Sequence, residues 1–552
     1  MTKQRLLFFV FFLFYLAIIA KLFYLQVLNP SPLTDTTYLK TNKILPERGK
    51  IYDRNGEPLA VNKSSYLLYI EPKKMQDKNY TVKKLDEILQ IGEATLEAKI
   101  DETKDWVSIK DGIGRDQKQK LMALGLKGLG FEDKFQRYYP ESSLAAHLLG
   151  FVGKNTQGEG VGYFGIEGFY NKDLVGLPGI VKSDRDILGK PILIGTQQKL
   201  DSENGRDLYL NIDASIQEVI KRKLQNGLET YGAKEGCIIV VNPNILEILA
   251  LSCLPDFAVE NYYKFSEDFF KNPAISNLYE PGSTFKPFIM AAALEEKSIR
   301  PDDFYEEKGP VEIGGYTIKT WNDKYEGKIS VTRILEKSSN VGIVHISQLL
   351  GNKKLYDYLR SYGFGSSTGI DLQGEASGYL KPQSEWYPVD FATVSFGQGI
   401  AVTPIQMIRA FSALINGGAL LKPLVVQRID SLGEEKRIKT SLEKRVISNQ
   451  TSEIIKKMLT ATVENGEVRW AKPKGYQIAG KTGTAQIPIK GHYDPTKTVA
   501  SFIGFAPVNE PKFLALVILH EPKTSPWGSE TAAPLFFEVA KELLVYYNIA
   551  PD

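Results

Sequence analysis

The chain has 552 residues, enough for two to four domains with a large buried core. Its 68 basic and 65 acidic residues give a net charge of +3, so the composition shows no electrostatic footprint for nucleic acid. Two cysteines and four dispersed histidines exclude a thiol-rich scaffold and offer no metal-ligand spacing. We therefore expect no nucleic-acid partner, no metal and no cofactor.

An apolar stretch near the N-terminus runs from Leu6 to Leu28 and is broken only by Lys21 and Gln26. As a helix it extends roughly 34 Å, which is enough to cross a bilayer. Two basic residues precede it and none follows before Lys40, so the positive-inside rule predicts a cytoplasmic N-terminus and an extracytoplasmic remainder. A cleaved signal peptide is disfavoured because no small-x-small site follows a short apolar core, and a buried core helix is disfavoured by the terminal position.

A polar, proline-containing linker from Asn29 to about Asp35 leads into the string Arg48-Gly-Lys-Ile-Tyr-Asp53-Arg-Asn-Gly56. Asn-Gly is a turn signal, so Lys50–Asp53 and Leu59–Val61 are predicted to form a hairpin, for which no chemistry is required. Residues 82–126 alternate helix-period stretches with charged turns and predict a structural subdomain.

A polar, glycine-containing run from Thr196 to Asp207 indicates a domain boundary near residue 205. Beyond it, the patterns predict a strand, a helix and a hairpin, then at the far end two more strands and a helix capped by Ser529. The predicted ranges are 208–213, 216–231, 236–243 with 247–255, 497–508, 512–521 and 529–547. With a mainly helical middle, this order predicts an α/β sandwich whose mixed or antiparallel sheet has its first and last strands as neighbours.

The two cysteines, Cys237 and Cys253, lie on the two arms of the first predicted hairpin, about equally far from its tip. A disulfide across the hairpin is one interpretation, if the compartment is oxidising. A buried free thiol is the commoner state of a cysteine in an apolar strand. Both alternatives stay open at this point.

The string Ser283-Thr-Phe-Lys286 stands at the start of a predicted helix, because Pro287 is tolerated only if the helix begins near Ser283. Lys286 then projects from the same helix face, which places its amine near the serine hydroxyl. A serine becomes a nucleophile when a neutral base takes its proton, and burial with nearby positive potential can lower the pKa of a lysine enough to provide that base. In isolation such a pair is more often an N-cap serine with a solvated lysine.

Two further strings complete the set. Ser338-Ser-Asn340 falls in a predicted turn between helices, and Gly480-Lys-Thr-Gly-Thr-Ala485 continues a predicted strand from Tyr476. The small side chains of the last string leave room for an extended peptide to pair with that strand. A phosphate-binding loop is disfavoured, since no G-x-x-x-x-G-K-[ST] precedes a helix.

In this order the three strings resemble the active site of the penicillin-binding protein and serine β-lactamase superfamily. The resemblance implies that Ser283 is the nucleophile and Lys286 its base. It implies that Ser338 relays a proton, that the Asn340 amide hydrogen-bonds Lys286 and the substrate, and that Lys481 supplies positive potential. These five residues are the expected catalytic set.

The same resemblance implies a substrate-binding set on the last string. The hydroxyls of Thr482 and Thr484 would bind a substrate carboxylate, and Gly483 removes steric hindrance. The backbone N–H groups of Ser283 and Thr484 would form the oxyanion hole.

The resemblance covers nearly the whole chain. The string from Arg48 resembles the start of the non-catalytic pedestal of class B penicillin-binding proteins, and three later strings resemble its packing segments: Arg137–Pro140, Leu148–Val152 and Gly165–Phe169. The implied fold class is an α/β (α+β) transpeptidase domain with helices on an antiparallel sheet, preceded by an elongated mixed α/β pedestal and one transmembrane helix. The expected segments are 1–29 (cytoplasmic tip and anchor), 30–205 (dimerisation-like pedestal) and 206–552 (transpeptidase).

The implied function is a peptidoglycan D,D-transpeptidase of the bacterial cell membrane, cross-linking stem peptides through a serine acyl-enzyme that β-lactams also form. The string Ser395-Phe-Gly-Gln-Gly-Ile-Ala-Val-Thr-Pro404 resembles a box beneath the active site and favours the septal, cell-division branch, with a polytopic glycan polymerase as partner. A class A β-lactamase is disfavoured, because no E-x-x-x-N lies between Asn340 and Lys481. Glycan polymerisation is predicted absent, and a D,D-carboxypeptidase or a membrane-anchored sensor of wall peptide or β-lactam remains the alternative.

Overall fold

The computed structural model describes residues 3–28, 39–140, 144–184, 198–431, 433–489 and 492–551. The predicted linker from Asn29 to Asp35 lies outside the described residues, as does the start of the polar run at Thr196. The chain divides into two compact units, one made of residues 1–47 and 176–204 and the other of residues 48–175 and 205–552.

The first unit contains the apolar N-terminal helix α1, Lys3–Phe23, which continues as a π-helical turn, Tyr24–Leu28. The stretch Gln4–Leu28 is long and apolar enough to cross a membrane, as the sequence predicted. The unit also contains a three-stranded antiparallel sheet in the order β1-β8-β9, with bounds Leu39–Ile44, Gly179–Asp184 and Gln198–Leu200.

The predicted Asn-Gly hairpin is present at the start of the second unit, where β2, Ile51–Tyr52, pairs with β3, Pro58–Ile70. The Asp53 carboxylate fixes the turn, since its Oδ1 accepts the backbone N–H groups of Asn55 and Glu57 at 2.7 and 2.8 Å. β2 also pairs in parallel with β10, so one seven-stranded sheet holds strands from both sides of residue 205. The other strands of this sheet are β4 (Val107–Ile113), β5 (Leu129–Tyr138), β10 (Asp207–Leu210), β18 (Val426–Ser431) and β19 (Glu434–Arg437).

The helical stretches predicted between residues 82 and 126 form α2, α3 and α4, with bounds Lys78–Leu89, Glu93–Lys99 and Arg115–Ala123. Their apolar faces pack against β3 and β4 in a small core of their own, which includes Leu68, Leu85, Leu96, Ile109 and Leu121. This part of the chain is therefore a structural subdomain, as the sequence predicted.

Two of the predicted packing strings and the string that begins at Arg48 meet in one buried charge cluster. Glu167 lies in the short helix α6, Gly165–Phe169, and is completely buried. Its carboxylate accepts hydrogen bonds from Arg48 Nε and Arg137 Nε, both at 2.7 Å, and from the Tyr139 hydroxyl at 3.3 Å. Burial alone would raise the pKa of Glu167, but the charges of Arg137 and Arg48 hold it below its usual value.

The later part of the chain forms a five-stranded antiparallel sheet in the order β12-β11-β23-β22-β21. The bounds are β11 Glu235–Asn242, β12 Glu247–Leu254, β21 Ala479–Ile489, β22 His492–Ala506 and β23 Phe513–His520. In this sheet the first strand in chain order, β11, pairs with the last, β23, as predicted. The strand predicted at 208–213 is not part of it, because it forms β10, which pairs with β2 and β18 in the seven-stranded sheet.

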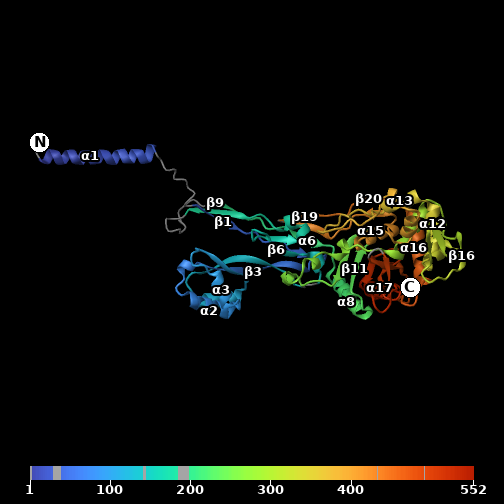
Figure 1. The fold of residues 1–552 in the computed structure, drawn as a ribbon. Helices are drawn as coiled ribbons and strands as arrows, with labels where there is room; N and C mark the ends of the chain where they lie inside the picture. The colour runs from blue at the N-terminus through green and yellow to red at the C-terminus, as the bar shows by residue number, and fades with distance from the viewer. Residues whose placement is uncertain are drawn as a thin grey trace. The chain divides into compact units, whose positions relative to one another are not determined.

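Helices cover both faces of this sheet. Along β11, Ile238 and Val240 pack with α8 (Ala214–Tyr231) and α17 (Ala532–Tyr546), which lie side by side (Figure 1). The alternate residues Ile239 and Val241 belong to the larger core on the other face, with α10 (Lys286–Glu295) and α15 (Pro404–Ile415). Further helices of this part are α9 (Pro273–Ser276), α11 (Val331–Glu336), α12 (Asn340–Leu350), α13 (Asn352–Ser361), α14 (Pro388–Ser395) and α16 (Asn449–Glu464).

The prediction that Ser529 caps the last helix is wrong. The helix α17 begins at Ala532 with Thr531 as its N-cap residue, and no side chain caps it. The Ser529 side chain instead lies near Glu467 and lowers the pKa of that carboxyl group. A second boundary also differs: β22 begins at His492 rather than near residue 497, because it forms a long hairpin with β21.

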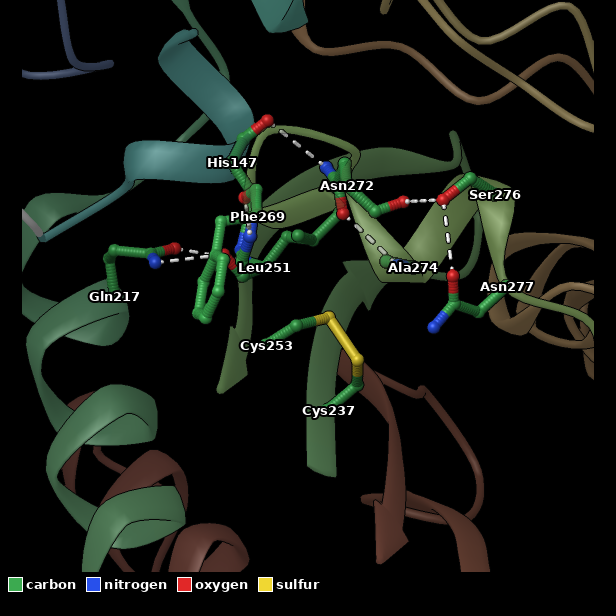
Figure 2. Close-up of a disulfide and its surroundings, with 10 residues drawn as sticks. All are labelled: His147, Gln217, Cys237, Leu251, Cys253, Phe269, Asn272, Ala274, Ser276 and Asn277. Carbon is green, nitrogen blue, oxygen red and sulfur yellow. Dashed lines mark hydrogen bonds between the residues drawn. A yellow bond between two sulfur atoms is a disulfide. The ribbon is translucent and has the colours of Figure 1, made fainter. Parts of the chain in front are cut away.

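The two cysteines are joined by a disulfide. Cys237 and Cys253 are directly opposite each other on β11 and β12, and both are buried (Figure 2). The sequence left a free thiol and a disulfide open, and the pairing register of the hairpin decides between them in the structure.

Candidate active site

Ser283 lies in a 3-10 turn, Gly282–Phe285, that runs directly into α10. The backbone N–H of Lys286 donates to the Ser283 carbonyl, and Pro287 takes the second position of α10, where its missing N–H is tolerated. The serine side chain is partly exposed, whereas Lys286 is completely buried. The turn packs tightly on β21, since a Cβ on Gly282 would lie 2.8 Å from the Thr484 carbonyl oxygen.

The amine of Lys286 is held by the second predicted string. Its Nζ donates to the Ser338 carbonyl at 2.5 Å, to the Asn340 Oδ1 at 2.8 Å and to the Ser338 Oγ at 3.2 Å. The Asn340 amide is itself oriented by donating to the Lys319 carbonyl at 3.0 Å. Burial lowers the pKa of Lys286 well below its ordinary value, and the charge of Lys481 lowers it further. Such a lysine can serve as a neutral base.

Ser338 occupies the predicted turn between α11 and α12. Its φ of +59° is unusual for a residue other than glycine, and such strained backbone is typical of functional sites. The next residue, Ser339, caps α12 by accepting the Gly342 N–H at 2.9 Å, which holds the turn in place. The Ser338 Oγ is thereby set between two amines, since it lies 3.2 Å from the Nζ of Lys286 and 3.0 Å from that of Lys481.

The third predicted string forms part of β21, the strand at one edge of the sheet. Lys481 Nζ donates to the hydroxyl of Thr482 at 3.1 Å as well as to Ser338, and burial lowers the pKa of Lys481 to about 8. A Cβ on Gly483 would lie 2.4 Å from Ser501 Oγ and 2.9 Å from the Pro281 carbonyl oxygen, so only glycine fits there.

Together the strings enclose a cavity of about 90 Å³. The predicted residues that line it are Ser283, Ser338, Asn340, Thr482 and Thr484. Lys286 and Lys481 do not line the cavity, but the amines of both donate hydrogen bonds to the Ser338 hydroxyl. The other lining residues are Gly282, Trp321, Phe396, Gln398, Glu467 and Trp527. A larger cavity of about 360 Å³ lies beside β11 and β23, but none of the predicted site residues lines it. We therefore identify the candidate site by the residues that line it and not by the volume of the cavity.

The glycine-rich box from Ser395 supports the turn Gly282–Phe285 that carries Ser283. The backbone N–H of Gly282 donates to the Gly397 carbonyl at 3.0 Å, and the Gly399 N–H donates to the Glu280 carboxylate at 2.9 Å. As predicted, a helix follows at Pro404, where α15 begins.

Three lining residues were not found from the sequence: Trp321, Glu467 and Trp527. The two tryptophan rings come from different loops and contact each other with centroids 5.0 Å apart. Each of the three is an isolated residue in a loop without periodicity or motif, so no pattern in the sequence could have placed it at the site.

The family model described as Penicillin binding protein transpeptidase domain matches residues 236–541, and the one described as Penicillin-binding Protein dimerisation domain matches residues 43–210. The chain is similar to Stage V sporulation protein D of Bacillus subtilis (strain 168), with 35% identity over 100% of this chain and 87% of that protein. It is also similar to Peptidoglycan D,D-transpeptidase FtsI of Escherichia coli (strain K12), with 30% identity over 97% of this chain and 90% of that protein.

Among solved structures, the chain is similar to Penicillin Binding Protein 2X from Streptococcus thermophilus. The TM-score is 0.77 at 26% identity, and the match covers 92% of this chain and 80% of that one. The similarity therefore extends over most of the chain and is not confined to the transpeptidase region.

Proposed function

The chain belongs to the penicillin-binding protein transpeptidase family, and from that membership we propose how its own residues catalyse peptidoglycan cross-linking. The protein is a peptidoglycan D,D-transpeptidase that acts through a serine acyl-enzyme. The observation that carries the assignment of residues is the meeting of all three strings at one cavity, with both lysines on the hydroxyl of Ser338.

The first half-reaction acylates the enzyme. Ser283 Oγ attacks the carbonyl of the penultimate D-alanine, and its proton passes to the neutral amine of Lys286. When the tetrahedral intermediate collapses, the C–N bond to the terminal D-alanine breaks, and the leaving amine receives a proton through the Ser338 hydroxyl. The low pKa of Lys286 supports this role, because a lysine of ordinary pKa would be protonated at neutral pH.

The second half-reaction returns the same groups to their starting states. An amine of a neighbouring stem peptide attacks the ester carbonyl of the acyl-enzyme, loses a proton towards Lys286 and forms the new peptide bond. The Ser283 oxygen leaves and regains its proton. A β-lactam enters the first half-reaction when its ring amide takes the place of the D-alanyl peptide bond.

Substrate binding follows from the position of β21 at the sheet edge. An extended stem peptide can pair with that edge as an added strand, as the small residues of the third string allow. Lys481 and the hydroxyls of Thr482 and Thr484 would then meet its carboxylate. The backbone N–H groups of Ser283 and Thr484 would form the oxyanion hole.

Cellular placement is part of the same proposal. The apolar helix α1 anchors the chain in the cell membrane with its N-terminus in the cytoplasm, which puts Ser283 on the wall side. Residues 30–205 act as the pedestal and residues 206–552 as the transpeptidase, and a polytopic glycan polymerase is the partner. We assign the protein to septal wall synthesis, and a tagged copy that stays off the septum would contradict this.

Labelling with a fluorescent penicillin tests the proposal. The full chain in membranes is expected to become labelled, and Ser283→Ala is expected to stay unlabelled. Depletion of the protein is expected to lower the number of peptide cross-links. Unlabelled wild-type protein would refute the enzyme assignment, whereas labelling with no effect on cross-links would favour a sensor. Loss of pentapeptide trimming without loss of cross-links would favour a carboxypeptidase.

A further inference from the structure

Two buried lysines share one oxygen atom at this site without a salt bridge. Lys286 is completely buried and Lys481 is 3% exposed, and both donate to Ser338 Oγ. Their other acceptors are also neutral: backbone carbonyls, the Asn340 amide and the Thr482 hydroxyl. Burying an ammonium group without an anion beside it costs free energy. Burying two ammonium groups that donate to the same oxygen atom costs more, because the two positive charges also repel each other. Within the described residues, the protonation of this pair must therefore depend on a carboxylate beyond hydrogen-bond distance.

Glu467 is that carboxylate. It lies in the loop between α16 and β21 and is partly buried. It lines the cavity of about 90 Å³ that Ser283 and Ser338 also line. It also lines a second, small cavity of about 10 Å³ together with Lys481, but Lys286 does not reach that cavity. The Ser529 hydroxyl is close enough to lower the pKa of the Glu467 carboxyl group. Glu467 thus faces Lys481 more directly than it faces Lys286.

The other acidic groups nearby are already engaged. Glu336 lines the same small cavity, but Arg333 pairs with it at 3.1 Å and Asn465 donates to it at 2.9 Å. Glu530 lies close to Glu467 but lines neither of the two cavities, and it accepts the Ser525 hydroxyl at 2.6 Å. Among the described residues around the two lysines, Glu467 is therefore the anion whose charge is left for them.

We infer that Glu467 is a positioning residue of this site, which holds the proton on Lys481 and so leaves Lys286 as the neutral base. The inference rests on the proposed function, because it concerns how the proposed base is kept neutral. The Glu467 charge stabilises one ammonium group, and the geometry selects Lys481 for it. The ammonium of Lys481 then disfavours a second positive charge at Lys286 across the shared Ser338 hydroxyl.

Electrostatics supports the same division of roles. The charge of Glu467 raises the pKa of both lysines against the lowering effect of burial, which leaves the pKa of Lys481 at about 8. The pKa of Lys286 stays well below its ordinary value, because burial and the charge of Lys481 both lower it. Burial raises the pKa of Glu467, and the charges of Lys481 and Lys286 oppose that rise. Without Glu467, Lys481 is expected to lose its proton at a lower pH. The positive charge that is proposed to bind the substrate carboxylate is then lost at that lower pH as well.

The test is the pH profile of acylation by a penicillin, measured as the second-order rate constant on the full chain in detergent micelles. The variants are Glu467→Gln, Glu467→Asp and, as a matched control on the same small cavity, Glu336→Gln. Removing one neighbouring charge lowers a lysine pKa by about one unit. From about pH 8 for Lys481, Glu467→Gln should then acylate roughly eightfold more slowly than wild type at pH 8.5 and less than twofold more slowly at pH 6.5.

The controls separate electrostatics from folding. Glu467→Asp keeps the charge and is expected to keep the alkaline limb within a few tenths of a pH unit of wild type, and Glu336→Gln is expected to leave it unmoved. A uniform loss of rate in Glu467→Gln with an unshifted alkaline limb would overturn the inference and assign Glu467 a structural role. An equal shift in Glu336→Gln would overturn it as well. If the wild-type chain were not acylated at any pH, the proposed function itself would fail instead.

Discussion

The buried cluster of Arg48, Arg137 and Glu167 joins three separate segments of the chain, and it leads to a prediction about stability. The substitution Glu167→Gln removes the negative charge that faces the guanidinium groups of Arg48 and Arg137, whose side chains are 11% and 4% exposed. Breaking a buried ion pair by neutralising one partner costs about 3–5 kcal/mol, because the remaining charge stays buried. Since glutamine keeps a carbonyl acceptor, we expect about 3 kcal/mol.

Hydrogen exchange of the amides in α6 measures this locally, without assuming that the whole chain unfolds in one step. A loss of about 3 kcal/mol corresponds to roughly 150-fold faster exchange. Glu132→Gln is the matched control, since Glu132 is exposed and lies 3.6 Å from Lys134, and it should change exchange very little. A change below threefold in Glu167→Gln would refute the reasoning.

The same cluster has a pH signature. The pKa of Glu167 is lowered in the folded protein by Arg137 and Arg48 acting against burial, so its stabilising effect is present above the ordinary glutamate pKa of about 4.3. The effect is lost as the pH falls through the lower, folded-state value. The difference between wild type and Glu167→Gln is therefore expected to shrink on acidification below about pH 4, and a difference that grew instead would contradict the assigned charge state.

Three further predictions concern the later part of the chain. Gly483→Ala sets a methyl group 2.4 Å from Ser501 Oγ, and displacing the nucleophile turn from β21 should slow penicillin acylation at least about 100-fold with unchanged circular dichroism. Asn340→Ala removes an acceptor from the buried lysine base and should slow acylation roughly ten- to 100-fold; a fully active variant would contradict that hydrogen bond. The pair Cys237→Ala with Cys253→Ala opens a loop of sequence separation 16 and should lower the local stability of β11 and β12 by about 3 kcal/mol, which is roughly 150-fold faster hydrogen exchange of their amides. Reductant should speed this exchange in wild type but not in the variant.

The sequence predicted the elements that have strong local patterns. The apolar run of α1 and the hairpin of Cys237 and Cys253 follow from hydrophobic periodicity and turn residues, which are local properties. The pairing of β11 with β23 is not local, and its prediction came from the order of the elements, with strands at both ends of a mainly helical module. The start of α17 was misplaced because serine and threonine are both good N-cap residues, and here the N-cap is Thr531 without any side-chain bond.

The site was only partly predictable for a physical reason. The spacing of Ser283 and Lys286 on one helix predicts that they lie close together, and the roles of the other residues in the three strings follow from the resemblance of those strings to a known family. Trp321, Glu467 and Trp527 reach the cavity from loops whose path depends on tertiary packing. The cluster of Arg48, Arg137 and Glu167 likewise joins strings up to 119 residues apart, a contact that no local pattern contains.

The central claim is that Ser283 is the acylated residue. Peptide mapping by mass spectrometry after reaction of the full chain with benzylpenicillin tests it most directly. We expect one penicilloyl adduct, on the peptide that contains Ser283, and none on the same peptide of Ser283→Ala. An adduct on a different residue, or an unmodified wild-type chain under conditions in which it is folded, would contradict the account.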